Sequence, residues 1–265
     1  MTDQNIMDIR PVPVQQYKNA TVEEAIAHGC DIIQPKYDGW NARIEIHYGW
    51  VTWYSKSDRK YRQILYPDSE LHAVLYAEHM FGTQWSKQAG REGLNYVFDI
   101  HTLNGENVAG FTYRERYSLV RSLLNRLPSG FSAVPTFPIS AYAETWQNYV
   151  VNNEFEGVVF RRKTDPLTAL ILRHKNTITE DLRIVGFIEG EGKHAGRLGA
   201  VQAVTKTGVP VDVGGGFDDL QRYEIWNARA KYLGRWFEVE AKGRFESGSL
   251  RHPNFIRWRD DLTSA

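Results

Sequence analysis

The sequence predicts an α+β protein: antiparallel sheets with flanking helices in residues 1–182, followed by a small all-β domain in residues 183–265. Three observations support this interpretation. Apolar and polar residues alternate in many short runs, which is typical of half-buried strands. Capping boxes, in which Thr or Asp precedes Glu or Gln by three residues, mark helix starts at Thr21, Thr112 and Asp218. After residue 182, short strands rich in glycine and aromatic residues largely replace the helices.

In the first part, residues 44–48 and 51–54 are expected to form a hairpin. The helix that starts at Thr112 carries a leucine stripe that should pack in the core before Pro128 ends it. A second helix is expected over residues 142–151. The remaining strands are expected at residues 75–81, 95–100, 157–160 and 169–175.

Composition limits the choice of function. The 32 basic and 32 acidic residues give a net charge of zero, so a nucleic-acid partner must be held by local clusters of Lys and Arg. The single cysteine, Cys30, excludes an internal disulfide, and no Cys/His spacing resembles a zinc site. Residues 1–14 contain no signal segment and no apolar run is of membrane length, so we expect a cytoplasmic protein without a membrane partner.

One short stretch concentrates the chemistry. In Gln34-Pro35-Lys36-Tyr37-Asp38-Gly39, a lysine stands between a strand and a tight turn. A buried or charge-crowded ammonium can lose its proton and become a nucleophile. On these residues alone, an exposed lysine in a hairpin is the simpler interpretation.

Other cations gather at three places. The loop 55–62 carries four cations among hydroxyl and aromatic groups, which suits either phosphate contacts or a solvated loop. Arg173 and Lys175 are two positions apart and point to one face of their strand. They are either a functional pair or charges that protect a sheet edge. Arg257 and Arg259 repeat this spacing, and guanidinium groups suit the oxygens of a polyphosphate.

Residues 183–265 combine about five short strands with one small helix, which is the outline of an OB-type barrel. Three glycines, residues 214–216, precede that helix and form either a tight loop or a phosphate nest. The chain has no Walker sequence, dinucleotide fingerprint or internal repeat.

Six motifs occur in a family's order along nearly the whole chain. They are Lys36-Tyr37-Asp38-Gly39, Ser55-Lys56, Phe98-Asp99 with Leu103-Asn104-Gly105, Glu156-Gly157-Val158-Val159, Arg173-His174-Lys175 and Arg257-Trp258-Arg259-Asp260. Together they resemble the covalent nucleotidyltransferases, and most closely the small two-domain ATP-dependent DNA ligases of phages and bacteria. The resemblance implies a nucleotidyltransferase (adenylation) domain followed by an OB-fold β-barrel.

The resemblance also implies a reaction. Lys36 would attack the α-phosphate of ATP to form lysyl-AMP, and the AMP would pass to a 5′-phosphate at a nick before the 3′-hydroxyl displaces it. ATP and Mg²⁺, with Mn²⁺ as an alternative metal, are the implied cofactors. The implied partner is nicked duplex DNA, bound by a monomer. Two alternatives stay open: a ligase that prefers RNA 3′ ends or RNA/DNA hybrids, and an inactive nick-binding module.

The resemblance assigns roles to single residues. Phe98 would stack on the adenine, Glu156 would bind the metal, and Lys175 would contact the α-phosphate, with Arg173 supporting the phosphates. Glu78 is the candidate second carboxylate for the ribose or the metal, although the Asp-Gly-Glu expected there is absent.

The remaining assignments include the positions where the chain departs from the family pattern. Asn41 stands where the family has arginine, so Arg43 is the candidate replacement. Lys56 replaces an arginine, and Asp261 replaces the lysine that often ends the last motif. Nucleotide contacts are expected from Asp38 and Arg43, pyrophosphate contacts from Arg257 and Arg259, and nucleic-acid contacts from Ser55, Lys56, Arg59, Lys60, Arg161 and Arg162.

Overall fold

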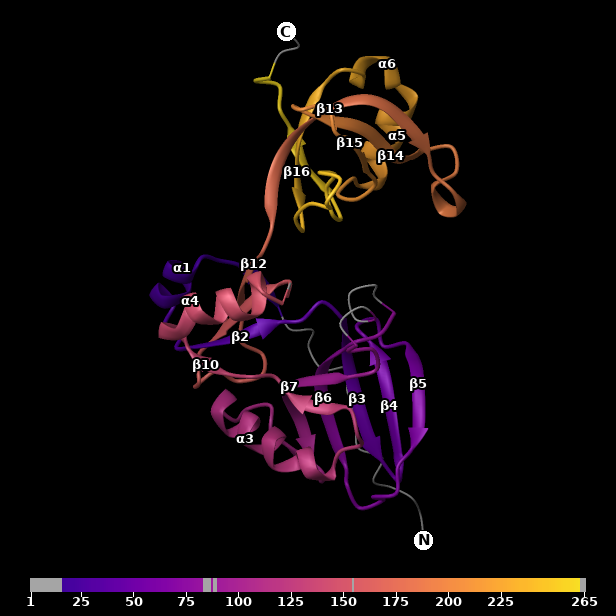
Figure 1. Ribbon diagram of the computed structural model, residues 1–265. Coiled ribbons are helices and arrows are strands. Elements are labelled where there is room, and N and C mark those ends of the chain that lie inside the picture. Colours follow the sequence, from indigo (N-terminus) through magenta and orange to yellow (C-terminus); the bar gives the residue numbers. More distant parts are fainter. Residues whose placement is uncertain (1–15, 83–86, 88–89, 154, 263–265) are drawn as a thin grey trace. The chain divides into compact units, whose positions relative to one another are not determined.

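The structure is a computed structural model that describes residues 16–82, 87, 90–153 and 155–262 (Figure 1). It confirms a mixed α+β fold in which strands predominate. The chain divides into two compact units, Met1–Lys175 and Asn176–Ala265. This division precedes the boundary expected at residue 182 because β13 (Ile178–Glu189) already pairs from its first residue with β16 (Trp236–Ala241) of the second unit. The expectation for residues 1–14 lies outside the described residues.

The first unit contains two sheets. One has seven strands in the order β5-β4-β3-β6-β7-β8, with β9 pairing parallel to β7. The other has five strands in the order β1-β12-β11-β2-β10. The strands are β1 (Tyr17–Asn19), β2 (Ile32–Lys36), β3 (Trp40–His47), β4 (Trp50–Ser55), β5 (Lys60–Leu65), β6 (Ala73–His79), β7 (Asn95–Leu103), β8 (Glu106–Asn107), β9 (Phe131–Ala133), β10 (Phe137–Pro138), β11 (Gly157–Arg161) and β12 (Ile171–Lys175).

The helices begin where the sequence predicts. Capping boxes at Thr21 and Thr112 start α1 (Val22–Ala27) and α3 (Tyr113–Leu123). In each box the Thr hydroxyl accepts a hydrogen bond from the backbone N–H of the Glu three residues later. The carboxylate of that Glu accepts a hydrogen bond from the backbone N–H of the Thr. Short turns follow α3 at Leu124–Arg126 and precede α4 at Ile139–Ala141; α4 (Tyr142–Thr145) continues into a π-helix, Trp146–Val151.

The core of the seven-stranded sheet lies between that sheet and α3. Alternate residues of β3, including Ile44 and Ile46, are fully buried there because successive strand residues point to opposite faces. The expected leucine stripe of α3 packs against them, with Leu123 and the following Leu127 buried. Each fully buried aliphatic side chain contributes about 1.5–3 kcal/mol. This core therefore fixes one face of the sheet and leaves the opposite face for the pocket described below.

The five-stranded sheet also has one apolar face. Ile33 of β2, Val158 and Phe160 of β11, and Leu172 of β12 pack into a core with Ala25 of α1. Since the side-chain period of a strand is two, the residues between these positions must face the other way. The alternation therefore turns Gln34 and Lys36 of β2, Arg161 of β11, and Arg173 and Lys175 of β12 toward one common side.

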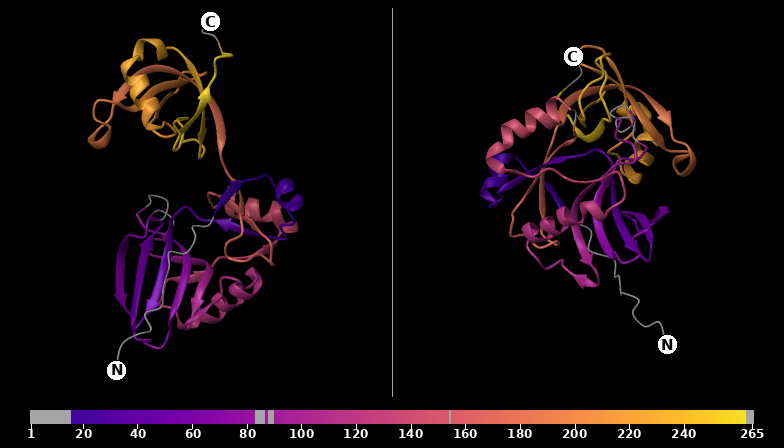
Figure 2. Two further views of the ribbon diagram at one scale, coloured as in Figure 1. Left: turned by 180° about the vertical axis from the view of Figure 1, so that it is seen from behind. Right: turned by 60° about the horizontal axis from the view of Figure 1, so that its bottom comes forward.

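The second unit is a five-stranded antiparallel sheet in the order β15-β14-β13-β16-β17. Bulges between Ile184 and Gly186 and between Ile188 and Glu189 accompany the curved path of β13, drawn in orange (Figure 2). Its other elements are a short turn (Gly192–His194), β14 (Leu198–Thr205), β15 (Pro210–Val213), α5 (Asp219–Asn227), α6 (Arg229–Tyr232) and β17 (Asn254–Trp258). A capping box at Asp218 starts α5, as expected.

The expected barrel needs one correction. Among the described residues no strand ladder joins β15 to β17, and only an isolated bridge between Gly215 and Asn254 lies between their neighbouring segments. The backbone pairing of the barrel is therefore not closed, although its core, centred on Phe237 and Val239, is continuous. No helix among the described residues is both long and apolar enough to cross a membrane.

Candidate active site

Three neighbouring strands bring two lysines to one carboxylate. Gly157 of β11 pairs with Lys36 of β2 on one side and with Lys175 of β12 on the other. Glu156, the residue before Gly157, accepts the Lys36 ammonium on Oε2, and its Oε1 lies 3.1 Å from Lys175 Nζ. The lysine side chains are 18% and 23% exposed and that of Glu156 is 10% exposed. The site is thus a partly buried carboxylate between two ammonium groups.

Gly157 makes this approach possible. A Cβ atom at this position would lie 2.0 Å from the carbonyl oxygen of His174 and 2.8 Å from the Cα of Lys175. Both atoms belong to the backbone of β12, so neither can turn aside. The glycine that follows the acid in the sequence is therefore required for β11 to sit between the two lysine-bearing strands.

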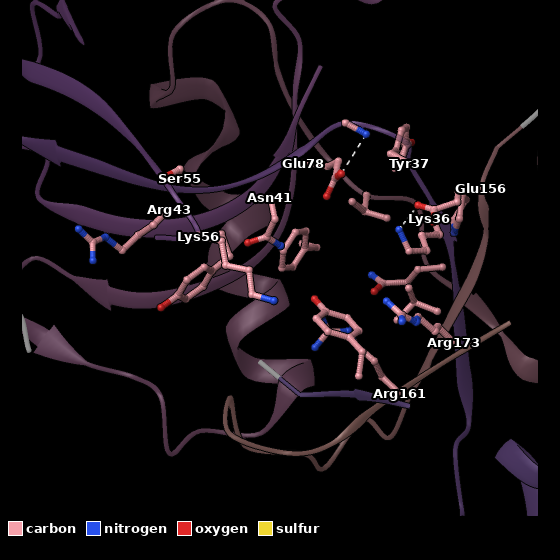
Figure 3. Close-up of a pocket in the computed structure, with 18 of the residues that line it drawn as sticks. Lys36, Tyr37, Asn41, Arg43, Ser55, Lys56, Glu78, Glu156, Arg161 and Arg173 are labelled. Atoms are coloured by element: carbon pink, nitrogen blue, oxygen red, sulfur yellow. Dashed lines mark hydrogen bonds and ion pairs between the residues drawn. The ribbon is translucent and has the colours of Figure 1, made fainter. Parts of the chain in front are cut away.

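A pocket of about 340 Å³ opens next to Lys36 (Figure 3). This volume is within the range of small-molecule sites. Both sheets of the first unit contribute to it. The lining residues are Tyr17, Gln34, Pro35, Lys36, Tyr37, Gly39, Asn41, Arg43, Ser55, Lys56, Asp58, Tyr76, Glu78, Phe98, Val134, Glu156, Val159, Arg161 and Arg173.

Part of the pocket wall is apolar and aromatic. Phe98 of β7 and Val159 of β11 both line it.

Gln34, almost fully buried, donates to Tyr113 Oη at 2.6 Å and to Thr136 Oγ1 at 2.9 Å. Gln34 was not among the expected site residues, although its position two before Lys36 places both side chains on the same face of β2. Tyr37 was also not expected; its ring stacks on Tyr96 with centroids 3.8 Å apart.

Glu78 of β6 supplies a second carboxylate to the pocket. Its Oε1 accepts the backbone N–H of Gly39 at 2.9 Å, which ties the turn after Lys36 to β6. Burial raises the pKa of Glu78 to about 7; Glu156 and Asp38 add to the rise, whereas Lys36 and the Gly39 bond oppose it. Burial therefore favours the protonated form of Glu78 more than that of an exposed glutamate.

Asn41 and Arg43 both line the pocket because they are two positions apart on β3. Asn41 pairs across the sheet with Glu78. Arg43 is held by Asp58 Oδ1 at 2.6 Å and by Glu45 Oε1 at 2.9 Å. Figure 3 shows its guanidinium turned away from Lys36, whereas the Lys56 amine extends into the pocket.

The structure corrects the expected position of Arg161. It was expected to contact nucleic acid, but it is only 5% exposed and its Nη1 lies 3.2 Å from Asp99 Oδ2. Alternation along β11 turns it inward, where its guanidinium lies over the Tyr113 ring at 4.6 Å. Within the described part of the chain, its Nε has no hydrogen-bond partner. Arg161 thus belongs to the pocket wall and not to an exposed surface.

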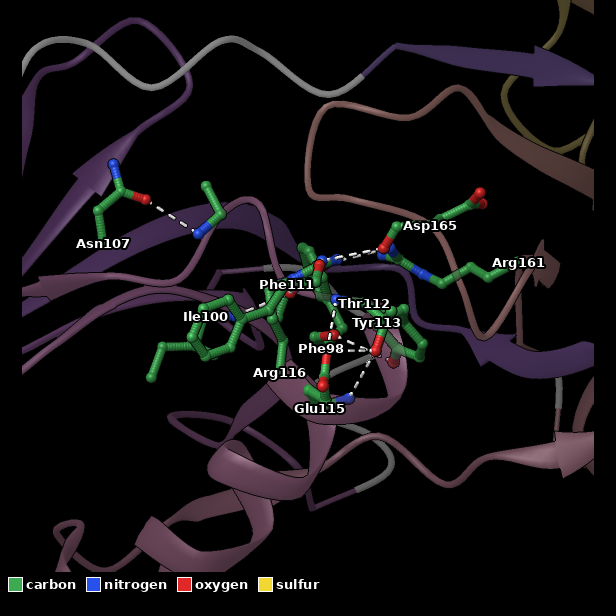
Figure 4. Close-up of polar contacts among 12 residues, drawn as sticks. Phe98, Ile100, Asn107, Phe111, Thr112, Tyr113, Glu115, Arg116, Arg161 and Asp165 are labelled. Atoms are coloured by element: carbon green, nitrogen blue, oxygen red, sulfur yellow. Dashed lines mark hydrogen bonds and ion pairs between the residues drawn. The ribbon is translucent and has the colours of Figure 1, made fainter.

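Asp99 anchors a charge network beneath the pocket. It is fully buried, and Arg116, also fully buried, donates to it from Nε at 2.7 Å. Arg116 also donates to the carbonyls of Phe111 and Asp165 (Figure 4). One carboxylate therefore serves two buried guanidinium groups, those of Arg116 and Arg161.

The other expected residues divide into three groups. Ser55, Lys56, Phe98 and Arg173 line the pocket, and Lys175 reaches it through Glu156. Asp38, Arg59, Lys60 and Arg162 lie outside the lining, with Arg162 paired to Asp165 at 2.7 Å. Arg257 and Arg259 belong to the second unit, where they pair with Glu238 at 2.7 Å and with Asp181 and Asp261 at 2.5 and 2.7 Å.

A divalent metal at this site would need oxygen atoms of a bound molecule in addition to protein side chains. In the described parts of the chain, no group of three or more His, Cys, Asp or Glu side chains could hold a metal ion. Glu156 and Glu78 fit Mg²⁺ as one or two carboxylates that act together with phosphate oxygens, which is how Mg²⁺ is commonly held at nucleotide sites.

Comparison with known proteins relates the chain to known folds. Residues 189–259 match the family described as DNA ligase OB-like domain. The structure described as "DNA binding with a minimal scaffold: Structure-function analysis of Lig E DNA ligases" is 20% identical, covers 94% of this chain and 100% of its own, and gives a TM-score of 0.63. No curated protein matches in sequence.

Two further structures, Pmar-Lig_PreS3 and Pmar-Lig_Pre., are each 18% identical to the chain. They cover 92% and 93% of this chain and 67% of their own, with TM-scores of 0.59 and 0.60. The chain therefore has a fold similar to that of these DNA ligase structures, and residues 189–259 of its second unit match the DNA ligase OB-like domain model.

Proposed function

We propose that this protein is an ATP-dependent polynucleotide ligase that seals 5′-phosphate/3′-hydroxyl nicks in duplex DNA through lysyl-AMP. The position of Lys36 carries the proposal. Its ammonium ends at a pocket of nucleotide size, on a carboxylate that it shares with Lys175. A module that only binds phosphate has no need of a lysine held against an acid in this way. The ligase fold supports the same conclusion.

The pocket suits ATP in one orientation. The ring of Phe98 and the side chain of Val159 offer flat apolar surfaces for the adenine. Lys36, Arg173 and Lys175 provide positive charge for the phosphates at the other part of the site. We assign the ribose to Glu78, whose partly protonated carboxyl can both donate and accept hydrogen bonds.

In the first step, the ammonium of Lys36 loses a proton to solvent and its Nζ attacks the α-phosphorus of ATP. A P–N bond forms and Nζ releases a second proton to solvent, while the bond from the α-phosphorus to the bridging oxygen breaks and pyrophosphate leaves with the bonding electron pair. Lys175 and Arg173 stabilise the charge on the phosphate oxygens, which is the main requirement of such transfers. A bound Mg²⁺, held by Glu156 together with the phosphates, would neutralise further charge.

In the second step, an oxygen of the DNA 5′-phosphate attacks the same phosphorus. The P–N bond breaks, Lys36 regains its proton, and the AMP is transferred to the 5′ end. In the third step, the 3′-hydroxyl loses its proton and attacks the 5′-phosphorus of the DNA. A phosphodiester forms and AMP leaves. The protein's task is to hold these groups in line.

Intact-protein mass after incubation with ATP and Mg²⁺ tests the proposal. The wild type should gain one AMP, and Lys36→Ala should gain none. Lys163→Ala is the matched control, because Lys163 is an exposed lysine of the same unit. A wild type that neither gains AMP nor releases it to added pyrophosphate contradicts the proposal. Sealing assays on nicks with deoxyribose and ribose 3′ ends then separate DNA from RNA as the substrate.

A further inference from the structure

Two large aromatic side chains are exposed at one end of the seven-stranded sheet. Trp40 is 45% exposed and Phe81 is 40% exposed. Their ring centroids are 5.5 Å apart, and Tyr61 lies 5.6 Å from Trp40 and 6.4 Å from Phe81. We call Trp40, Tyr61 and Phe81 the aromatic surface. Exposed apolar groups that touch one another in this way commonly mark an interaction site.

The aromatic surface lies at the same strand ends as the pocket. Trp40 begins β3 and pairs with His79 of β6, one position from the pair formed by Asn41 and Glu78. Asn41 and Glu78 line the pocket, whereas Trp40 is two positions before the core residue Ala42 and so belongs to the other face of the sheet. The aromatic surface and the pocket therefore meet at the same strand ends from opposite faces. Trp40 also directly follows Gly39, whose amide is bonded to Glu78.

Positive charge flanks the aromatic surface. Tyr61 belongs to β5, the edge strand of the sheet, and its neighbours Lys60 and Arg62 are exposed. The single acid in the preceding loop, Asp58, is already paired with Arg43. Cations alone could serve to protect an edge strand. That purpose does not explain the exposed rings of Trp40 and Phe81, which lie outside β5.

We propose that the aromatic surface, with Lys60 and Arg62, is a contact surface for the nucleic-acid strand whose end is processed at Lys36. Aromatic rings offer stacking or sugar contacts to any nucleotide, and cations beside them bind the phosphates. The inference rests on the proposed ligase function and deepens it by naming where this chain holds the nucleotides next to the break. It adds contacts made by the first unit alone.

Binding of the full-length protein to a fluorescently labelled nicked duplex tests this inference. Trp40→Ala and Phe81→Ala should each weaken binding about tenfold, as expected for loss of one stacked base contact. Trp40→Tyr should retain most of the affinity. Trp50→Ala is the matched control, because Trp50 is 42% exposed but starts β4 at the opposite end of the same hairpin, and it should bind like the wild type.

The mass assay keeps the two proposals distinguishable. All four variants should still gain AMP, which shows that the pocket and the fold are intact. If the wild type gains AMP and Trp40→Ala and Phe81→Ala bind as tightly as Trp50→Ala, the surface is wrong while the ligase proposal stands. If the wild type gains no AMP, the ligase proposal fails first. If Trp40→Ala does not fold, Phe81→Ala alone decides, because Phe81 follows β6 and takes no part in its pairing.

Discussion

Lys36 and Glu156 are held in contact by a strand register in which Gly157, directly after the acid, stands opposite the lysine. The same glycine also stands opposite Lys175. The contact therefore depends on the pairing of three strands and not only on the two side chains. Changes in the backbone of β11 should consequently disturb the chemistry as much as changes in the charged groups.

We expect Gly157→Ala to destabilise the first unit by on the order of 3 kcal/mol, because the new Cβ would collide with the backbone of β12. AMP gain should fall with it as Glu156 moves away from the lysines. Thermal unfolding and intact mass measure the two effects. Gly110→Ala is the control, since open space surrounds that position, and it should be nearly neutral. Equal behaviour of the two variants would contradict the account of Gly157.

Lys175→Met should slow AMP gain by about 100-fold, because the variant removes a fixed positive charge that would stabilise the transferred phosphate. Its side chain is of similar length, so the unfolding temperature should change little. A time course of intact mass measures the rate. Lys163→Met, in an exposed pair with Asp31, should match the wild type. A rate for Lys175→Met equal to that of the control would remove Lys175 from the reaction.

The raised pKa of Glu78 should make the free energy of unfolding depend on pH. Its pKa is raised from 4.5 to about 7, chiefly by burial, so the unfolded chain releases this proton at lower pH than the folded chain. Stability that is fully present below pH 4.5 is thus lost as the pH rises to about 7. Relative to Glu78→Gln, which does not titrate, the wild type should lose up to about 3 kcal/mol of unfolding free energy over this range.

Urea unfolding of the wild type and Glu78→Gln at several pH values measures this difference. Glutamine keeps an oxygen that can accept the Gly39 amide, so the turn after Lys36 should be preserved. A difference between the two proteins that stays constant with pH would show that Glu78 titrates normally.

Asp99→Asn should destabilise the protein by about 3 kcal/mol or more. The change leaves the buried guanidinium groups of Arg116 and Arg161 without their shared negative charge. Asp68→Asn is the matched control, because Asp68 pairs with Arg126 at the surface and should cost no more than about 1 kcal/mol. Chemical denaturation compares them, and similar small losses in both variants would argue against the network's importance.

Much of the fold could be predicted because local signals agree with the final structure. The three capping boxes start their helices, and the alternating run before Gly49 forms the β3–β4 hairpin. The domain boundary was expected at residue 182, after the start of β13, because residues Ile178–Asp181 include polar side chains that no strand pattern marks. These residues form a strand because they pair with β16.

The site was only partly predictable for a similar reason. Lys36, Phe98 and Glu156 could be named from motif order, and Glu78 was a candidate although its expected motif is absent; the structure brings all four to one pocket. Gln34 was missed, although its spacing from Lys36 was a usable signal. Arg161 was misplaced because a run of three cations after an apolar strand reads as exposed, whereas Asp99, far away in sequence, neutralises it in the interior.

By itself, the sequence determined the α+β fold class, through local periodicity and spacing, and the order of the motifs on which the family resemblance and the expected site residues rest. Tertiary structure alone decided that Lys36 and Lys175 share Glu156, that burial raises the pKa of Glu78, and that Trp40 meets Phe81. These relationships arise from strand register and desolvation. Both depend on segments far apart in the chain, whose pairing no local pattern specifies.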